Sequence, residues 1–144
     1  MREFLFRGKT WLSVDKMSSN WVYGGLSQGS GDRFFIHTYQ PVEKHVVYSD
    51  SVTQYTGILD KNGKKLFEGD VVRFISEDRI EIHALCVYDT DFLQFAFETK
   101  FSFYTLSDIV SLYDQGLEEK FEIIGNIFDN PELVNWEVDF IETK

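Results

Sequence analysis

The chain has little cysteine, little proline and no long apolar run. A single cysteine, Cys86, excludes a disulfide within the chain. Two prolines and no low-complexity tract argue against long disordered segments. No apolar stretch approaches the roughly 20 residues of a membrane-spanning helix. The first residues carry charges where a signal peptide needs an apolar core. We therefore expect a soluble cytoplasmic protein that makes no contact with a membrane.

Positive charge is scarce, above all in the last third of the chain. With 14 basic and 24 acidic residues, the net charge is −10. Residues 1–50 carry six basic and five acidic groups, residues 51–100 carry six and nine, and residues 101–144 carry two and ten; the sums are +1, −3 and −8. An acidic surface repels phosphate backbones, which disfavours nucleic-acid binding without excluding a local basic patch.

The motifs of common catalytic sites are also missing. The sequence contains no nucleophile elbow, no Walker loop and no His-Glu-x-x-His zinc motif. We therefore expect no enzymatic activity, no catalytic residue and no cofactor. His83 and Cys86 are zinc-ligand types, but at this spacing on one strand they face opposite sides, and Cys86 fits a small core residue better. Asp89-Thr90-Asp91 lacks the later glycine and glutamate of a calcium loop, so a polar turn is expected.

Aromatic residues, by contrast, are abundant. They make up 17% of the chain and favour pleated, half-buried surfaces. Short extended segments recur about every ten residues, which predicts a mainly β fold with one or two short helices. An α+β fold with an antiparallel sheet is the alternative. Strands are expected over 3–7, 21–23, 34–39, 71–75, 80–88, 92–97 and 121–128. A turn is expected over 8–10, a strand end at 24–25, and helices over 107–116 and about 130–136.

The strongest turn signal lies in the stretch from Gln54 to Phe74. Asn62-Gly63 is favoured in type I′ turns, whose two central residues both need a positive φ. Apolar pairs flank it, so a hairpin is expected. Glu68 and Asp70, on either side of Gly69, fit solvent-facing acids or caps of backbone N–H groups better than a catalytic pair.

Two groups of side chains in the sequence could bind nucleic acid. Lys61, Lys64 and Lys65 form the concentrated basic cluster of this acidic chain and could contact phosphate or a partner, although lysines at a hairpin tip are usually just solvated. The aromatic residues near the N-terminus could stack bases, or could pack within a sheet, which fits better without interleaved basic residues. They are Trp11, Trp21, Tyr23, Phe34, Phe35 and Tyr39.

Three segments carry a family resemblance that spans most of the chain. They are Arg2-Glu3 with Phe6-Arg7-Gly8-Lys9 and Trp21-Val22-Tyr23-Gly24; Gln54-Tyr55-Thr56-Gly57 through Asp60-Lys61-Asn62-Gly63-Lys64 to Phe67-Glu68-Gly69-Asp70-Val71-Val72; and Ile124-Gly125-Asn126-Ile127-Phe128 with Asn130-Pro131-Glu132-Leu133. With these segments the chain resembles the YopX family of phage and prophage proteins. The resemblance implies an SH3-like small barrel core with additional N-terminal β-strands, and a location inside a bacterial cell. It implies no activity.

Together these observations favour one domain over residues 1–144. A subdivision into an N-terminal β extension (1–50), an SH3-like barrel (51–136) and an acidic tail (137–144) is compatible with them. The expected function is that of a non-enzymatic binding or assembly protein that contacts a host protein, a phage protein or itself. One alternative is a nucleic-acid-binding module that uses the lysine cluster. Another is an acidic mimic of nucleic acid that binds a host protein.

Overall fold

The computed structural model describes residues 3–11, 19–75, 79–105 and 121–134. The chain divides into two compact units, Met1–Gly57 and Ile58–Lys144. Eleven strands account for most of the described residues, which confirms the mainly β prediction. The closing helix is a short 3₁₀ turn, η4 (Pro131–Val134). The helix expected over 107–116 and the acidic tail lie outside the described residues.

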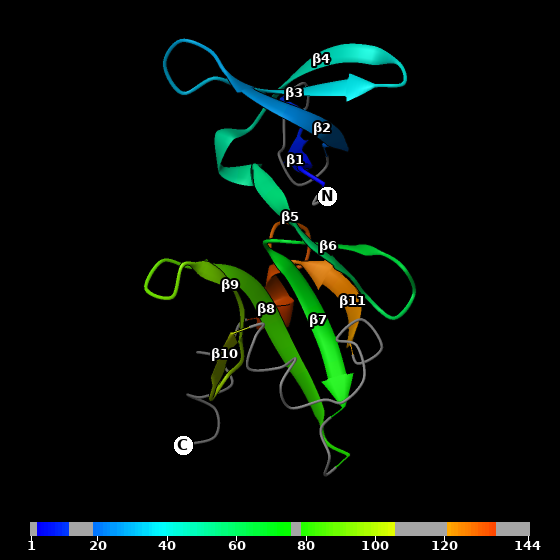
Figure 1. The fold of residues 1–144 in the computed structure, drawn as a ribbon, viewed down its shortest axis with the longest axis vertical. Helices are drawn as coiled ribbons and strands as arrows, with labels where there is room; N and C mark the ends of the chain where they lie inside the picture. The colour runs from blue at the N-terminus through cyan, green and yellow to red at the C-terminus, as the bar shows by residue number, and fades with distance from the viewer. Residues whose placement is uncertain (1–2, 12–18, 76–78, 106–120, 135–144) are drawn as a thin grey trace. The chain divides into compact units, whose positions relative to one another are not determined.

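The first unit is an antiparallel sheet (Figure 1). Its strands follow the order β4-β3-β2-β1-β5, and a 3₁₀ turn, η2 (Ser49–Ser51), precedes β5. The strands are β1 (Phe6–Lys9), β2 (Trp21–Gln28), β3 (Phe34–Tyr39), β4 (Val42–Val47) and the beginning of β5 (Thr53–Leu59). The expected strand over 34–39 is confirmed to the residue.

Three glycines of this sheet lie inside strands, so the turn expected over 8–10 and the strand end expected at 24–25 are wrong. Gly8 belongs to β1, and Gly24 and Gly25 belong to β2. A Cβ on Gly24 would collide with the His37 carbonyl group, whose carbon would lie 2.7 Å away. A Cβ on Gly8 would lie 2.9 Å from the Val47 side chain. Glycine is therefore needed here for close approach rather than for a turn.

Two cations are buried where β1, β2 and β5 meet. Arg7 and Lys9 are only 5% and 1% exposed. The Arg7 Nε donates a hydrogen bond to Thr53 Oγ1 at 2.9 Å, and its guanidinium lies 4.5 Å from the ring centroid of Trp21. The Lys9 Nζ lies 5.4 Å from the same ring. Cation–π contacts strengthen when they are desolvated, so this arrangement holds the centre of the first sheet together.

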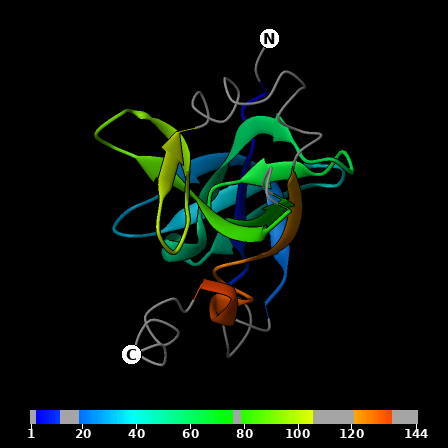
Figure 2. The ribbon, with the colours of Figure 1, turned by 90° about the horizontal axis from the view of Figure 1, so that it is seen from below.

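The second unit contains a five-stranded antiparallel sheet of order β10-β9-β8-β7-β11. The last residues of β5 and the whole of β6 come before this sheet in the chain. Figure 2 shows η4 in orange-red after β11. In place of a closed barrel, the described strands of the chain form two open antiparallel sheets. The strands of this unit are β6 (Lys65–Phe67), β7 (Asp70–Ile75), β8 (Glu81–Asp89), β9 (Gln94–Glu98), β10 (Phe103–Thr105) and β11 (Phe121–Asn126).

The core of the second unit lies on one face of this sheet. Cys86 is fully buried there, as expected for a small core residue. The rings of Phe97 and Phe121 pack edge to face, with their centroids 5.6 Å apart. Ile58, Phe74 and Tyr104 pack against this cluster from its margin. Its buried members are Leu66, Val72, Ala84, Cys86, Phe97, Phe121 and Ile123.

A buried carboxylate organises the hairpin between β5 and β6. Asp60 is 2% exposed, and its Oδ1 accepts hydrogen bonds from the backbone N–H groups of Asn62 (2.9 Å) and Lys64 (2.8 Å). Its Oδ2 accepts the N–H of Ile123 in β11 at 3.0 Å. The hairpin is confirmed, but the type I′ turn is wrong, because Gly63 has a φ of 80° whereas Asn62 has no positive φ. The Asp60 side chain sets the turn instead.

Side chains from the other family segments of this unit also accept hydrogen bonds from backbone N–H groups. The Asp70 Oδ2 accepts the N–H of Phe67 at 2.8 Å, which confirms the capping interpretation for this buried acid. The Asn126 Oδ1 accepts the N–H groups of Phe128 (3.0 Å) and Asp129 (2.9 Å) after β11. The family segments of the second unit are therefore occupied in shaping turns.

Replacing Asp60 with alanine should destabilise the second unit by about 3 kcal/mol. Three backbone N–H groups lose their acceptor, and a buried unpaired donor is costly. Urea denaturation followed by circular dichroism measures the loss. Asp89→Ala is the matched control, because the Asp89 carboxylate also accepts two backbone N–H groups, but in bonds that are open to solvent, so water replaces it at a cost below about 1 kcal/mol. Equal losses in the two variants would contradict this account.

In the first unit, Gly24→Ala should destabilise the sheet by about 3 kcal/mol, because the new Cβ must displace the backbone at His37. The adjacent Gly25→Ala is the control. Its Cβ meets only the Tyr39 hydroxyl at 3.0 Å, at the end of a side chain that can move. We expect a change below about 1 kcal/mol there. Hydrogen exchange of the β2 and β3 amides distinguishes the two variants, and similar protection in both would argue against the close approach.

Candidate functional site

An exposed apolar surface on the second unit is formed by the turn between β8 and β9 and by the first residue of β10. Phe92, Leu93 and Phe103 are 62%, 73% and 41% exposed, and we call these three residues the aromatic patch. The rings of Phe92 and Phe103 stack with centroids 6.3 Å apart. Exposed contiguous apolar side chains of this kind mark interaction surfaces more often than isolated ones do.

Two residues of the aromatic patch, Phe92 and Leu93, lie in a strained turn. The Asp89 carboxylate accepts the N–H groups of Asp91 (3.3 Å) and Phe92 (3.1 Å), which confirms the polar turn expected there. Leu93 has a φ of 55°, in the left-handed region that costs a residue with a Cβ about 1–2 kcal/mol. An exposed leucine held in this conformation does not contribute to the core, so the turn presents it to solvent at a cost in stability.

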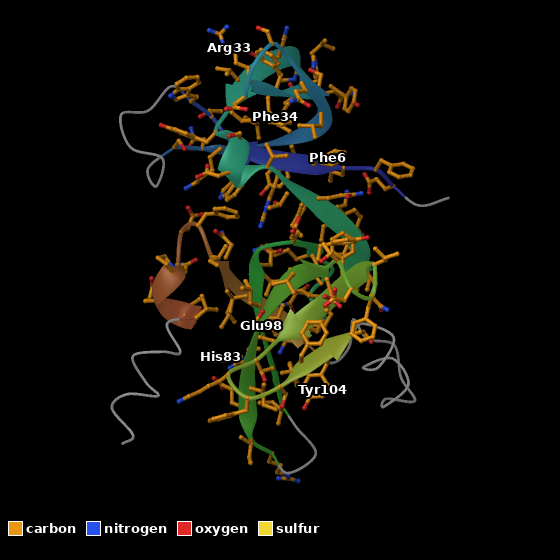
Figure 3. All side chains as sticks on the ribbon, turned by 90° about the vertical axis from the view of Figure 1, so that its left-hand side faces the viewer. Phe6, Arg33, Phe34, His83, Glu98 and Tyr104 are labelled. Carbon is orange, nitrogen blue, oxygen red and sulfur yellow. The ribbon has the colours of Figure 1, made fainter. Side chains whose placement is uncertain are left out.

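A second feature of this unit is a cleft of about 370 Å³, which we call the edge cleft. It is lined by Ile80–His83 at the start of β8, by the turn Thr99–Ser102, by Tyr104 of β10 and by Leu133 of η4. Figure 3 labels His83 and Tyr104, together with Glu98, on three strands of this sheet. The cleft is large enough to hold side chains of a ligand.

The cleft follows an edge of β8 that has no partner strand among the described residues. β7 pairs with β8 from Val71↔Leu85 to Ile75↔Glu81, whereas β9 pairs with β8 only from Leu85 onward. Within the described ranges, Glu81–Ala84 therefore have a neighbouring strand on one side alone. Alternate residues of an antiparallel strand direct N–H and C=O groups to opposite sides, so two of these four residues direct backbone groups towards the cleft.

On the face opposite the core, a row of charged side chains crosses β8, β7 and β11. Glu81 receives a hydrogen bond from His83 Nε2 at 2.7 Å and an ion pair from Arg73 at 3.4 Å. Arg73 also pairs with Glu122 at 3.4 Å, and Lys61 lies 3.1 Å from the same carboxylate. The hydrogen bond from His83, followed by the charge of Arg73, lowers the pKa of Glu81.

The three lysines of the predicted basic cluster do lie on one hairpin, but their roles differ. The Lys61 Nζ is neutralised by Glu122. The Lys64 backbone donates to Asp60, and Lys65 begins β6. A neighbouring carboxylate weakens the attraction of this cluster for phosphate, and nucleic-acid contact stays a prediction.

Basic residues also lie against aromatic rings in the first unit, where the sequence showed no interleaving. The Lys44 Nζ lies 4.2 Å from the Phe35 ring centroid, and Arg7 and Lys9 flank Trp21. These contacts depend on strand register, which places residues distant in sequence side by side. Because Arg7 and Lys9 are buried, they stabilise the sheet rather than present charge to a ligand.

A serine and a histidine that the sequence did not single out also meet in this unit. The Ser27 Oγ lies 2.6 Å from His37 Nε2, on adjacent strands β2 and β3. This is the distance of a nucleophile and its base. Within the described residues, no second hydrogen bond orients the imidazole, and the pair lies outside the edge cleft. It is a cross-strand hydrogen bond without the remaining parts of a catalytic site.

The described residues were also compared with the requirements of a metal site and of a membrane-spanning helix. His83 and Cys86 lie on opposite faces of β8, one at the surface and one in the core. No group of three or more histidine, cysteine or acidic side chains converges among the described residues. No helix within the same ranges is long and apolar enough to cross a membrane.

The similarity of this chain to known proteins extends over most of its length. It matches the YopX protein family over residues 6–135. No curated protein sequence matches it. Its fold is similar to the crystal structure of protein EF1440 from Enterococcus faecalis, with a TM-score of 0.55 at 19% identity over 94% of this chain and 100% of that chain. At this identity the likeness shows the fold alone.

His83→Ala should raise the pKa of Glu81 towards its ordinary value, because the main stabilising hydrogen bond to the carboxylate is lost. A lowered carboxyl pKa favours the folded state at neutral pH, and this contribution disappears as the pH falls through the folded value. Carboxyl-carbon NMR titration of Glu81 measures the shift. His37→Ala, in the other unit, is the control and should leave the Glu81 titration unchanged. An unchanged titration in the His83 variant would show that Arg73 alone sets it.

Proposed function

Because this chain belongs to the YopX family, we propose that it is a non-enzymatic binding or assembly protein of a phage or prophage. It acts through protein–protein contacts in the cytoplasm of a bacterial host. The aromatic patch is the observation that carries this proposal. Interface cores are enriched in aromatic residues and poor in charge, and the patch joins two stacked phenylalanines to an exposed leucine.

The distribution of the family segments supports the same function. In these segments, the side chains of Asp60, Asp70 and Asn126 accept backbone hydrogen bonds. The aromatic patch and most of the edge cleft lie between residues 80 and 104, outside the three segments that carry the sequence resemblance but within the stretch that matches the family. The turns that stabilise the second unit and the proposed partner-binding surface therefore come from different segments of the chain.

A protein partner fits the patch better than a nucleic acid does. The patch itself contains no basic residue, and the whole chain carries a charge of −10. Binding to phosphate backbones requires clustered cations, and the lysine cluster already has one of its charges paired with Glu122.

Replacing Phe92 and Leu93 together with serine should weaken the contact about thirtyfold, because truncating an interface anchor costs about 2 kcal/mol. The contact is measured in two ways: self-association by size exclusion with light scattering, and capture of a host or phage protein from a bacterial lysate. The matched control is Tyr39→Ser with Val42→Ser at the β3–β4 turn. These side chains are equally exposed, at 69% and 84%, but belong to the first unit.

Three outcomes would contradict the proposal. The first is a strictly monomeric protein that captures nothing. The second is binding of a single-stranded oligonucleotide at low salt that is lost when Lys61, Lys64 and Lys65 become alanine, which would support a nucleic-acid-binding module. The third is capture of a basic host protein that high salt releases and the patch variant leaves unchanged, which would support an acidic mimic of nucleic acid.

A further inference from the structure

We propose that the first unit binds a single strand of nucleic acid on the outer face of β2, β3 and β4. The bases stack on Tyr23 and Tyr39, and the phosphates lie beside Arg33 and Lys44. The outer face is the face of these strands opposite the fully buried Ile36. The inference goes beyond the proposed function, because it concerns a different ligand and the other unit.

Strand register gathers aromatic and polar side chains on the outer face. Gly25 pairs with His37 and Ser27 pairs with Phe35, so these residues and those two positions away from them share one face. On β2 and β3 the members of this face are Tyr23, Gly25, Ser27, Phe35, His37 and Tyr39. Aromatic rings on a sheet surface form a stacking platform for bases.

Two glycines leave room for aromatic rings to lie over β2. A Cβ on Gly25 would lie 3.0 Å from the Tyr39 hydroxyl, so the Tyr39 side chain crosses from β3 towards β2. A Cβ on Gly29 would lie 2.9 Å from the Phe35 ring. Tyr39 is nevertheless 69% exposed and Tyr23 is 46% exposed. A base can therefore reach both tyrosine rings from solvent.

Two exposed cations, Arg33 and Lys44, lie on the same face. Lys44 pairs with His37 in the sheet, and its Nζ lies 4.2 Å from the Phe35 ring centroid. A Cβ on Gly29 would lie 3.7 Å from the Arg33 Cβ as well as against the Phe35 ring, so Arg33 extends from this face too. Neither cation forms an ion pair with a described residue. Cations beside the rings distinguish this face from the aromatic patch, which has none.

The neighbouring acidic residues leave the outer face positive. Within the described strands β1 to β4 the one acidic residue is Glu43, which lies on the opposite face, 3.7 Å from His45. Asp32, in the exposed turn before Arg33, offsets one of the two positive charges. One uncompensated cation therefore remains, and a phosphate complements it.

The negative charge of the chain belongs to the other unit. Residues 1–57 carry six basic and five acidic groups, and residues 58–144 carry eight and nineteen, so the sums are +1 and −11. The whole-chain charge, which disfavours nucleic acid, therefore does not describe the first unit. Local clusters of cations, rather than net charge, determine where a phosphate backbone binds.

Labelled oligonucleotides of twelve thymidines or twelve uridines are the probes, and fluorescence anisotropy measures their binding to the whole chain. At least one should bind, and its dissociation constant should rise about sevenfold between about 50 and about 200 mM salt, because two phosphate contacts give a log–log slope of about −1.4. Binding of only the DNA or only the RNA would support the inference and identify the ligand. Binding of neither at about 50 mM salt would overturn it.

Tyr39→Leu tests the stacking. It should weaken oligonucleotide binding about tenfold, because stacking of a base on an aromatic ring is lost. Tyr39→Phe keeps the ring and should bind within about twofold of the unmodified chain. The control is the variant with alanine at Lys61, Lys64 and Lys65, which should leave binding unchanged. Loss of binding in this lysine variant, with full binding in Tyr39→Leu, would place the site on the second unit and overturn the inference.

Lys44→Gln tests the phosphate contact and should reduce the salt slope by about half. Lys100→Gln is the matched control, because Lys100 also lies over a phenylalanine ring, that of Phe101, at 5.3 Å but in the other unit; the slope should stay the same. Asp32→Asn removes the offsetting carboxylate and should tighten binding. Unfolding transitions of these variants should match that of the unmodified chain. Equal salt slopes in the two lysine variants would overturn the inference.

Failure here can be separated from failure of the proposed function. If neither oligonucleotide binds but association through Phe92 and Leu93 persists, the inference about the outer face is overturned and the proposed function stands. If an oligonucleotide binds as described and no protein contact depends on the aromatic patch, the proposed function is contradicted while the assignment of the outer face stands.

Discussion

The carboxylate of Asp60 joins two parts of the chain that lie 63 residues apart. It fixes the hairpin between β5 and β6 and at the same time accepts a backbone N–H of β11. β11 in turn pairs with β7, and β7 pairs with β8. A buried carboxylate is stable only when its oxygens are hydrogen bonded, so the turn and the sheet edge must form together. The open end of β8 is positioned by strands that this one side chain ties together.

Much of the β structure could be predicted because its strands are short, apolar and separated by polar turns. β3 and β7 follow the sequence pattern closely, and Cys86 lies in the core on the same face of β8 as Ala84, as expected for a small core residue. The glycines of the first sheet were wrongly predicted to end strands. Glycine is favoured both in turns and where two backbones pack closely, and the residue across the sheet determines which of the two applies. At Gly24 that neighbour is His37, and no local pattern reveals it. The turn at Asn62-Gly63 differed for a similar reason, since a side chain just before it sets the geometry.

The candidate site was harder to predict than the fold. The residues that stand out in the sequence, from Arg7 and Trp21 to Asp70 and Asn126, stabilise sheets and turns. The lysine cluster was visible, but the ion pair of Lys61 with Glu122 depends on the position of the hairpin turn beside β11, where the Lys61 N–H donates to the Phe121 carbonyl. The edge cleft combines residues from β8, a turn, β10 and η4, and it exists because β9 is shorter than β8. Strand lengths and registers are tertiary properties, so no motif could mark this surface.

The excess length of β8 over β9 has a consequence for the behaviour of the protein at high concentration. An unpaired strand edge is a starting point for uncontrolled association between identical molecules. Glu81 and His83 on this edge, backed by Arg73, place charges where a flat apolar strand would invite stacking. The same side chains that shape the cleft therefore act as gatekeepers against aggregation. A sequence change that made the edge a better template by removing these charges would also make the protein less soluble.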